Sequence, residues 1–343
     1  ISSGLVGSEM CIRDRNIDEN KIYEAVKESA TGHHEPGVKE LMKYGYIPSD
    51  LMVESIASSM EYAISDWGIA MLAKKLGKTD DFKYFLDRSK AYRSYFDEET
   101  GFMRGKFLDG SWRTPFDPVS AQHRINDYCE GNAWQYLWLT PQDPEGLIDL
   151  LGGDKNFTTK LDELFSMSSA LEEGSSMDIT GMIGQYAHGN EPSHHTAYMY
   201  AYAGEQYKIA KNVRHILTEF YTAQPDGLIG NEDCGQMSAW YIFSSLGFYP
   251  VNPQNGAYVF GSPIIDEAII ELDNGKSLEI IAENNSKKNK FIKEVYLNGK
   301  KHENSFITHK QIISGGKLKF VMGSDPNYDF GKLKTHRPKS KIY

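Results

Sequence analysis

Apolar positions recur at helical spacing through the first two thirds of the chain. Residues 49–76 carry an apolar stripe that includes Trp67, so we expect a long helix there, with Ser49 near its start and Gly77 ending it. Further helices are expected at residues 16–32, 80–96, 161–165, 168–171, 205–222 and 237–246, together with a short helix within residues 33–48 and a helix pair within 131–151. Helix pairs joined by short loops are typical of a helical bundle or barrel.

The period of the pattern changes after Pro250. Short β-type runs follow at residues 258–260, 268–272, 278–282, 293–297 and 317–321. Turn sequences separate them, and Asn298–Gly299 is the clearest hairpin signal. The pattern predicts a mainly α chain with a small antiparallel β unit near its C-terminus, whose strands are expected to be part of a sandwich.

Composition and charge argue against several classes of protein. The chain has 343 residues and a net charge of −10, which disfavours a nucleic-acid partner. No apolar run approaches the roughly 20 residues of a membrane-spanning helix. Three cysteines are too few for a disulfide scaffold. A Cys129–Cys234 bridge remains open, although two unpaired thiols are favoured.

The first 15 residues do not fit the pattern of the rest. They lack periodicity and do not resemble a signal peptide, and the run GSEMCIRDR looks like a translated sequencing-library adapter. We therefore leave residues 1–15 out of the fold prediction. The expectation is a C-terminal fragment whose signal peptide would lie in a missing part.

Three segments join a glycine-containing polar loop to an aromatic-rich helix. They are DYCEGNAWQYLW at residues 127–138, GQYAHGNEPSHHTAYMYAYA at 184–203, and GNEDCGQMSAWYIFSSLGFYP at 230–250. Glycines let the backbone approach a ligand closely, and carboxylates are favoured at helix N-termini. We expect helices around a pocket, with polar groups gathered at one end.

These motifs, with the closing MGSDPNYDFG, resemble glycoside hydrolase family 92 over residues 40–330. The resemblance implies a calcium-dependent exo-α-mannosidase that inverts the anomeric centre and acts on mannose-containing glycans, with α-1,2 linkages expected. It also implies an (α/α)₆ barrel, partial here over residues 16–250, with C-terminal strands over 251–335. A preceding β-sandwich domain would be missing and would pack on those strands. Family members imply a periplasmic or secreted location.

An inverting glycosidase needs one carboxylic acid to protonate the leaving oxygen and one carboxylate to activate water. The resemblance assigns Glu130 as the general acid and Asp233 as the general base. From the residues alone, each could instead cap the helix that follows it. Some family members carry an acid where this chain has Asn231, which leaves Asp233 as the expected sole base.

Oxygen ligands suit calcium, and the matched motifs supply Asn190, Glu191, Asp233 and Gln236. Substrate contacts are expected from residues of the same motifs: Trp134, His188, Glu191, His194, His195 and Asn231. A zinc site from the HGNEPSHH run is disfavoured, because adjacent histidines point apart.

Two other classes of function remain open. The chain could be another glycosidase or a polysaccharide lyase on the same barrel, or a non-catalytic glycan-binding protein. A lyase would release unsaturated, ultraviolet-absorbing products. A binding protein would bind sugar without turnover, unaffected by Glu130→Gln.

Overall fold

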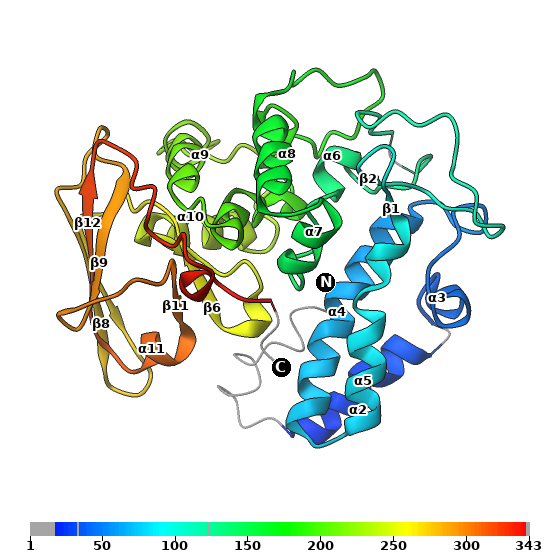
Figure 1. Ribbon diagram of the computed structural model, residues 1–343, viewed down its shortest axis with the longest axis horizontal. Helices are drawn as coiled ribbons and strands as arrows, with labels where there is room; N and C mark the ends of the chain where they lie inside the picture. The colour runs from blue at the N-terminus through cyan, green and yellow to red at the C-terminus, as the bar shows by residue number, and fades with distance from the viewer. Residues whose placement is uncertain (1–17, 33, 123, 341–343) are drawn as a thin grey trace. The chain divides into compact units, whose positions relative to one another are not determined.

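The computed structural model describes residues 18–32, 34–122 and 124–340 (Figure 1). The chain divides into two compact units. The first unit contains residues up to Leu151 together with Met167–Ile179 and Gly184–Tyr186. The second contains Gly152–Ser166, Thr180–Ile183 and residues from 187 onward. Within the described residues, no helix is both long enough and apolar enough to span a bilayer.

The first unit is mainly helical. Its elements are α2 (Glu19–Thr31), α3 (Val38–Tyr44), α4 (Ser55–Lys75), α5 (Thr79–Arg88), the 3₁₀ helix η2 (Ala91–Tyr95), β1 (Phe96–Asp97), β2 (Phe102–Met103), α6 (Ala133–Tyr136) and α7 (Pro144–Leu150). Helices α4 and α5 lie side by side (Figure 1). Tyr23 of α2, Ile69 of α4 and Phe85 of α5 share one buried cluster, which explains the predicted apolar stripe.

The long helix begins later than predicted. The expected start at Ser49 is wrong, because Glu54 has a left-handed backbone (φ 54°) that no α-helix can contain. The Ser49 hydroxyl instead hydrogen-bonds the Ser55 hydroxyl at 2.7 Å. Backbone N–H groups at the start of α4 donate to a distant segment: Glu54 N to Asn126 O at 2.9 Å, and Ile56 N to Asp127 O at 3.0 Å.

Two other helix predictions need correction. The helix expected over residues 80–96 is interrupted after Arg88, where the Ser89 hydroxyl donates to the Leu86 carbonyl at 2.7 Å and a 3₁₀ turn follows. The helix expected at residues 168–171 does not form. The Ser168 carbonyl accepts the Gln185 side-chain amide at 2.7 Å, a contact that ties this segment to a residue distant in sequence.

The second unit combines helices with two sheets. Its helices are α8 (Asp154–Ser166), η3 (Glu191–Ser193), η4 (Thr196–Ala203), α9 (Tyr207–Glu219), α10 (Gln236–Leu246), η5 (Pro253–Asn255), α11 (His309–Ile313) and η6 (Lys334–His336). Its strands are β3 (Met182–Ile183), β5 (Phe248–Tyr249), β6 (Ala257–Phe260), β7 (Glu267–Glu271), β8 (Ser277–Glu283), β9 (Phe291–Leu297), β10 (Lys300–Lys301), β11 (Phe306–Thr308) and β12 (Gly316–Gly323). The short strand β4 (Tyr186–Ala187) pairs with β3.

The larger sheet has the order β10-β9-β12-β8-β7, and the smaller has β11-β6-β5. The five predicted runs correspond to β6, β7, β8, β9 and β12, whereas β5 and β11 were not predicted. Asn298–Gly299 turns the β9–β10 hairpin with positive φ at both residues, as expected. The expectation of a wholly antiparallel unit is wrong at one pair, since β12 runs parallel to β8. The intervening chain places β12 between β8 and β9.

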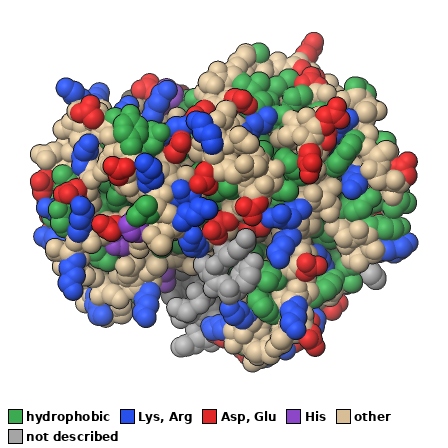
Figure 2. All heavy atoms as spheres, in the orientation of Figure 1, with side chains coloured by type: hydrophobic (Ala, Val, Ile, Leu, Met, Phe, Trp, Pro, Cys, Tyr) green, Lys and Arg blue, Asp and Glu red, His purple; other side chains and the backbone are tan. Residues whose placement is uncertain are grey.

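The two sheets share one apolar core, as strands of a sandwich do. Phe260 of the smaller sheet meets Phe320 of the larger edge to face, with ring centroids 5.2 Å apart. Leu278, Leu318 and Ile307 are buried in the same cluster. On the outside, acidic and basic side chains are interspersed over the face shown in Figure 2.

Candidate functional site

The loop before α10 has an unusual backbone. Asp233 (φ 50°), Cys234 (φ 54°) and Gly235 (φ 98°) are three consecutive residues with positive φ. Only Gly235 adopts this region without steric cost, and non-glycine residues held there concentrate at functional sites. The conformation turns the chain sharply into α10 and leaves Asp233 exposed to solvent.

The adjacent Glu232 caps α10. Its carboxylate accepts hydrogen bonds from the backbone N–H groups of Gly235 and Ser238, the second at 3.2 Å. The Ser238 side chain has the largest effect in lowering the pKa of Glu232, and the two backbone N–H groups lower it further. The capping role that the residues alone left open for Asp233 therefore belongs to Glu232, so the Asp233 carboxylate is not committed to the helix end.

Gln236, the first residue of α10, is held through its amide nitrogen. His194 Nε2 lies 2.9 Å from the His188 carbonyl oxygen, which can only accept. A neutral His194 therefore has its proton on Nε2, and its Nδ1 accepts from Gln236 Nε2 at 3.0 Å. The second amide proton of Gln236 points to the Tyr249 hydroxyl at 3.2 Å. This arrangement leaves the Gln236 carbonyl oxygen available to a ligand.

Both histidines of this network are buried and uncharged. His188 is 0% exposed and His194 is 2% exposed. Burial lowers the pKa of His194 to about 4, with the nearby His195 adding to the effect. Burial, together with the neighbouring His194, holds the pKa of His188 well below its ordinary value. Because His194 is neutral, only its Nε2 carries a proton, and its Nδ1 stays able to accept the hydrogen bond that orients Gln236.

An aromatic layer encloses the two histidines. His188 Nε2 lies 2.7 Å from the Tyr221 hydroxyl, and the His188 ring meets Trp240 with centroids 4.3 Å apart. Trp240 Nε1 donates to the His194 carbonyl at 2.9 Å. The aromatic partners Tyr221, Trp240 and Tyr249 were not predicted as part of the site. Trp240 and Tyr249 lie in the motif of residues 230–250, which is the signal that could have suggested them, whereas Tyr221 lies outside that motif.

The other predicted residues of the second unit lie around this network. Asn190 is buried at the start of η3, where its side-chain oxygen accepts from the Glu191 N–H at 3.2 Å. Glu191 is exposed, and its charge helps to raise the pKa of Tyr249, for which burial is the main cause, to about 12. His195 is 6% exposed, whereas Asn231 is exposed.

Glu130 belongs to the first unit and also has a left-handed backbone (φ 53°). The helix that follows it, α6, is capped by another residue. Asn132 Oδ1 accepts from Trp134 N at 3.0 Å, and Asn132 N donates to Gln135 Oε1 at 2.7 Å, which completes a capping box. The capping role left open for Glu130 therefore belongs to Asn132.

Trp134 and the cysteines complete the set of predicted positions. Trp134 is only 5% exposed and packs edge to face on Phe102, with centroids 4.8 Å apart. Its place is the core of the first unit. Neither Cys129 nor Cys234 forms a disulfide, and Cys11 lies outside the described residues.

The donor chemistry of the second unit fits a hard cation. Gln236 offers an amide oxygen whose own nitrogen is already committed, and Asp233 and Glu191 offer exposed carboxylates. Across residues 18–32, 34–122 and 124–340, no three His, Cys, Asp or Glu side chains form a group that could hold a metal. Calcium bound here would draw on amide, backbone and ligand oxygens as well as carboxylates.

Comparisons with known proteins converge on one family. The model of the glycosyl hydrolase family 92 catalytic domain matches residues 5–324. An uncharacterized secreted glycosidase of Arthroderma benhamiae is 28% identical over 352 residues, covering 90% of this chain and 43% of the relative.

Two solved structures are close to this fold. A family GH92 α-mannosidase of Bacteroides thetaiotaomicron in complex with mannoimidazole is 42% identical, with a TM-score of 0.95 over 99% of this chain and 45% of its own. An inverting family GH92 mannosidase of B. thetaiotaomicron VPI-5482 is 32% identical, with a TM-score of 0.88 over 98% of this chain and 47% of its own. The chain thus spans less than half the length of each of these relatives.

Proposed function

The chain belongs to glycosyl hydrolase family 92, and from that premise we propose that it hydrolyses terminal α-linked mannose of glycans, with inversion. Similarity to two mannosidases of the family supports the reaction and the substrate class. The preferred linkage in this proposal is α-1,2.

The observation that carries the proposal is shared by Glu130 and Asp233. Both have positive φ, a conformation that costs a non-glycine residue about 1–3 kcal/mol, while Asn132 and Glu232 perform the capping that could otherwise explain them. In the proposed reaction the Glu130 carboxylic acid donates its proton to the leaving glycosidic oxygen. The Asp233 carboxylate takes a proton from the water that attacks the anomeric carbon.

We assign calcium to the oxygens of Gln236, Asp233, Asn190 and Glu191. When bound, calcium would orient sugar hydroxyls and offset negative charge near them. His194 acts as a positioning residue in this proposal, because its Nδ1 holds the Gln236 amide so that the carbonyl oxygen faces the ligand. His188 supports the same network from its buried position, while His195, Glu191 and Asn231 remain the proposed sugar contacts. Trp134 would shape the site from within the core.

The proposal extends to architecture and location. We propose that the helices of residues 16–250 are part of an (α/α)₆ barrel and that residues 251–335 form its C-terminal strand unit. We also propose a secreted or periplasmic protein, because the A. benhamiae relative is described as a secreted glycosidase.

The test is mannose release from α-1,2-mannobiose by the longest open reading frame that contains this chain. Glu130→Gln and Asp233→Asn should each lower kcat/KM by about 10²- to 10⁴-fold. The exposed residues Glu99 and Asp226 provide matched controls, since Glu99→Gln and Asp226→Asn make the same chemical changes elsewhere. A calcium chelator should abolish release, and added calcium should restore it.

Each alternative function predicts a different result. A lyase would produce ultraviolet-absorbing unsaturated sugar instead of free mannose. A non-catalytic glycan-binding protein would bind mannosides unchanged in Glu130→Gln and release none. Retention of the anomeric configuration, read by NMR within the first turnovers, would contradict the roles given to Glu130 and Asp233.

A further inference from the structure

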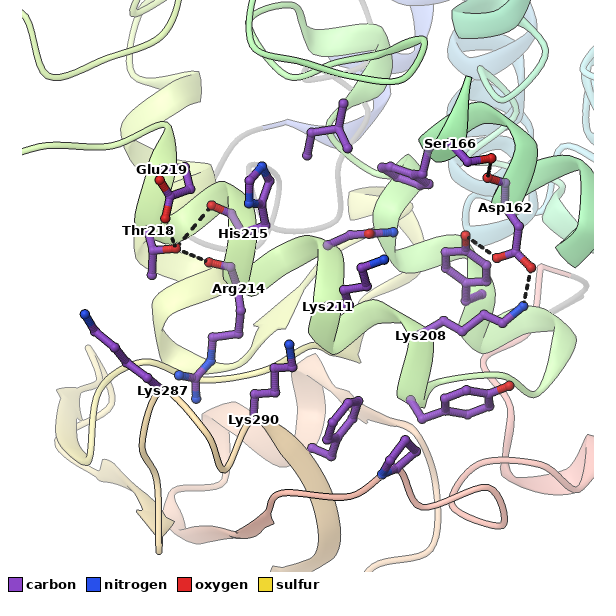
Figure 3. Close-up of a pocket in the computed structure, with 17 residues that line it drawn as sticks. Asp162, Ser166, Lys208, Lys211, Arg214, His215, Thr218, Glu219, Lys287 and Lys290 are labelled. Atoms are coloured by element: carbon purple, nitrogen blue, oxygen red, sulfur yellow. Dashed lines mark hydrogen bonds and ion pairs between the residues drawn. The ribbon is translucent and has the colours of Figure 1, made fainter. Parts of the chain in front are cut away.

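The second unit contains a pocket of about 890 Å³, and no residue of α10 is among those that line it. Residues of α8, of α9 and of the segment that leads into β9 line it (Figure 3). Phe165, Tyr200, Tyr207 and Phe291 supply aromatic surface, and Pro326 adds an apolar edge. Aromatic faces of this kind suit the C–H face of a sugar ring as well as other apolar groups.

The pocket also carries a local excess of positive charge, although the whole chain has a net charge of −10. Lys211 of α9 and Lys287 and Lys290 of the opposite segment all line it. Figure 3 shows Lys290 extending from the strand side toward α9, whereas Lys287 lies at the outer edge of the pocket and extends away from that helix. Among the described residues, none of these three ammonium groups forms an ion pair with a carboxylate.

The acidic residues of the pocket do not neutralise this excess. Asp162 is already paired with Lys208, whose Nζ lies 2.5 Å from its carboxylate and 2.6 Å from that of Glu205. Glu219 remains, and it accepts a hydrogen bond from the Thr218 hydroxyl at 3.3 Å. Among the described residues, the pocket lining therefore holds three lysines and one carboxylate that form no ion pair, a local positive charge that favours an anion.

The segment that carries two of these lysines is held in place by buried contacts. Arg214 of α9 is 9% exposed and donates to the Ser262 hydroxyl at 2.9 Å, to the Ser286 carbonyl at 3.2 Å and to the Asn285 side chain. The Ser262 hydroxyl in turn donates to the Lys290 carbonyl at 2.6 Å. These contacts fix the backbone of the segment that carries Lys287 and Lys290, so a ligand would have to order only the lysine side chains.

We propose that this pocket binds an anionic saccharide, a sugar carrying a phosphate or carboxylate group. The lysines would contact the anionic group, and the aromatic side chains would contact the ring. The inference does not depend on the proposed hydrolysis, because none of the pocket residues has a role in that reaction. Binding here would let the protein associate with acidic glycans at a place other than its reaction centre.

The experiment titrates the 343-residue chain, by calorimetry or ligand-observed NMR, with glucose, glucose 6-phosphate, glucuronic acid and inorganic phosphate. Comparing these probes distinguishes the contribution of the sugar ring to binding from that of the anionic group, and a phosphate from a carboxylate. Glucose 6-phosphate or glucuronic acid should bind more tightly than either glucose or phosphate, and the affinity should fall as salt is raised. No saturable binding of either charged sugar would overturn the proposal, as would equal binding of phosphate alone.

Variants assign the binding to this pocket. The double variant Lys211→Gln/Lys290→Gln should bind the charged sugar with about tenfold lower affinity. Glu219→Gln should raise the affinity for the charged sugar, because it removes a carboxylate that repels the anionic group. Lys276→Gln/Lys300→Gln makes the same charge change at exposed positions outside the pocket and should leave the affinity unchanged. Equal weakening by both double variants would show general charge attraction and would overturn the proposal. Thermal denaturation of each variant establishes that it is folded.

Discussion

His194 should stay uncharged in the folded protein when the pH falls from about 7 to about 5.5. Because the unfolded chain gains a proton over the same range, the free energy of unfolding should decrease. The pKa of the folded His194 lies at about 4, against an ordinary value of 6.5, because the ring is buried. Over this pH range the unfolded chain takes up a proton that the folded chain excludes. Stability conferred by the neutral form is therefore present at higher pH and is lost as the pH falls toward 4.

The size of the effect follows from these two pKa values. Each unit of difference corresponds to about 1.36 kcal/mol, and integrating the proton uptake between about pH 7 and pH 5.5 gives about 1.2 kcal/mol for His194. His188 should add a change of the same sign, since its pKa is also held low by burial.

Two measurements test this prediction. In the NMR spectrum of ¹³C-histidine-labelled protein, the His194 ring signal, assigned through His194→Gln, should not titrate above about pH 5. In urea denaturation, His194→Gln should be less stable at neutral pH but should lose about 1.2 kcal/mol less than wild type on acidification. His215→Gln removes an exposed histidine of the same unit and should leave the wild-type slope unchanged.

A His194 signal that titrates near pH 6.5 would refute the reasoning. It would mean that the ring reaches water or that Nδ1 is protonated at neutral pH. The Gln236 amide would then have to turn, because a protonated Nδ1 cannot accept its N–H. The same result would remove the argument that orients the Gln236 oxygen toward a cation.

Three further predictions concern the backbone and the buried charges. Asn132→Ala should cost about 1 kcal/mol in thermal denaturation because the capping box is lost, whereas Glu130→Gln should change stability by less than about 0.5 kcal/mol; the reverse order would return the capping role to Glu130. Gly235→Ala should cost about 1–2 kcal/mol from its positive φ alone, since open space surrounds the position, and Gly235→Asn should cost less in the same assay. Arg88→Met should cost about 3–5 kcal/mol because Asp66, 1% exposed, loses its buried partner; the double variant Asp66→Asn/Arg88→Met should be more stable than Arg88→Met, and equal urea midpoints would count against this explanation.

Local patterns in the sequence determined much of the fold. Helix α10 runs over Gln236–Leu246 and ends at Gly247, whose φ of 96° is the conformation that the glycine predicts. The Asn298–Gly299 turn and the β-type runs around it fall where expected. These features depend on short-range sterics and periodicity, which adjacent residues specify by themselves.

Long-range contacts decided what the pattern could not. Helix α4 begins at Ser55 because Asn126 and Asp127 provide backbone acceptors that neighbouring residues do not reveal. The parallel β8–β12 pair likewise depends on the path of the intervening chain.

The candidate site shows the same division. The sequence singled out Glu130, Asp233, His194 and Gln236 through their motifs, but it could not tell a capping carboxylate from one that is not committed to a helix end. Only the tertiary structure assigned the caps to Asn132 and Glu232. It also directed the two nitrogens of His194 to the His188 carbonyl and the Gln236 amide, because burial removes water as an alternative partner and leaves hydrogen-bond geometry to select the tautomer.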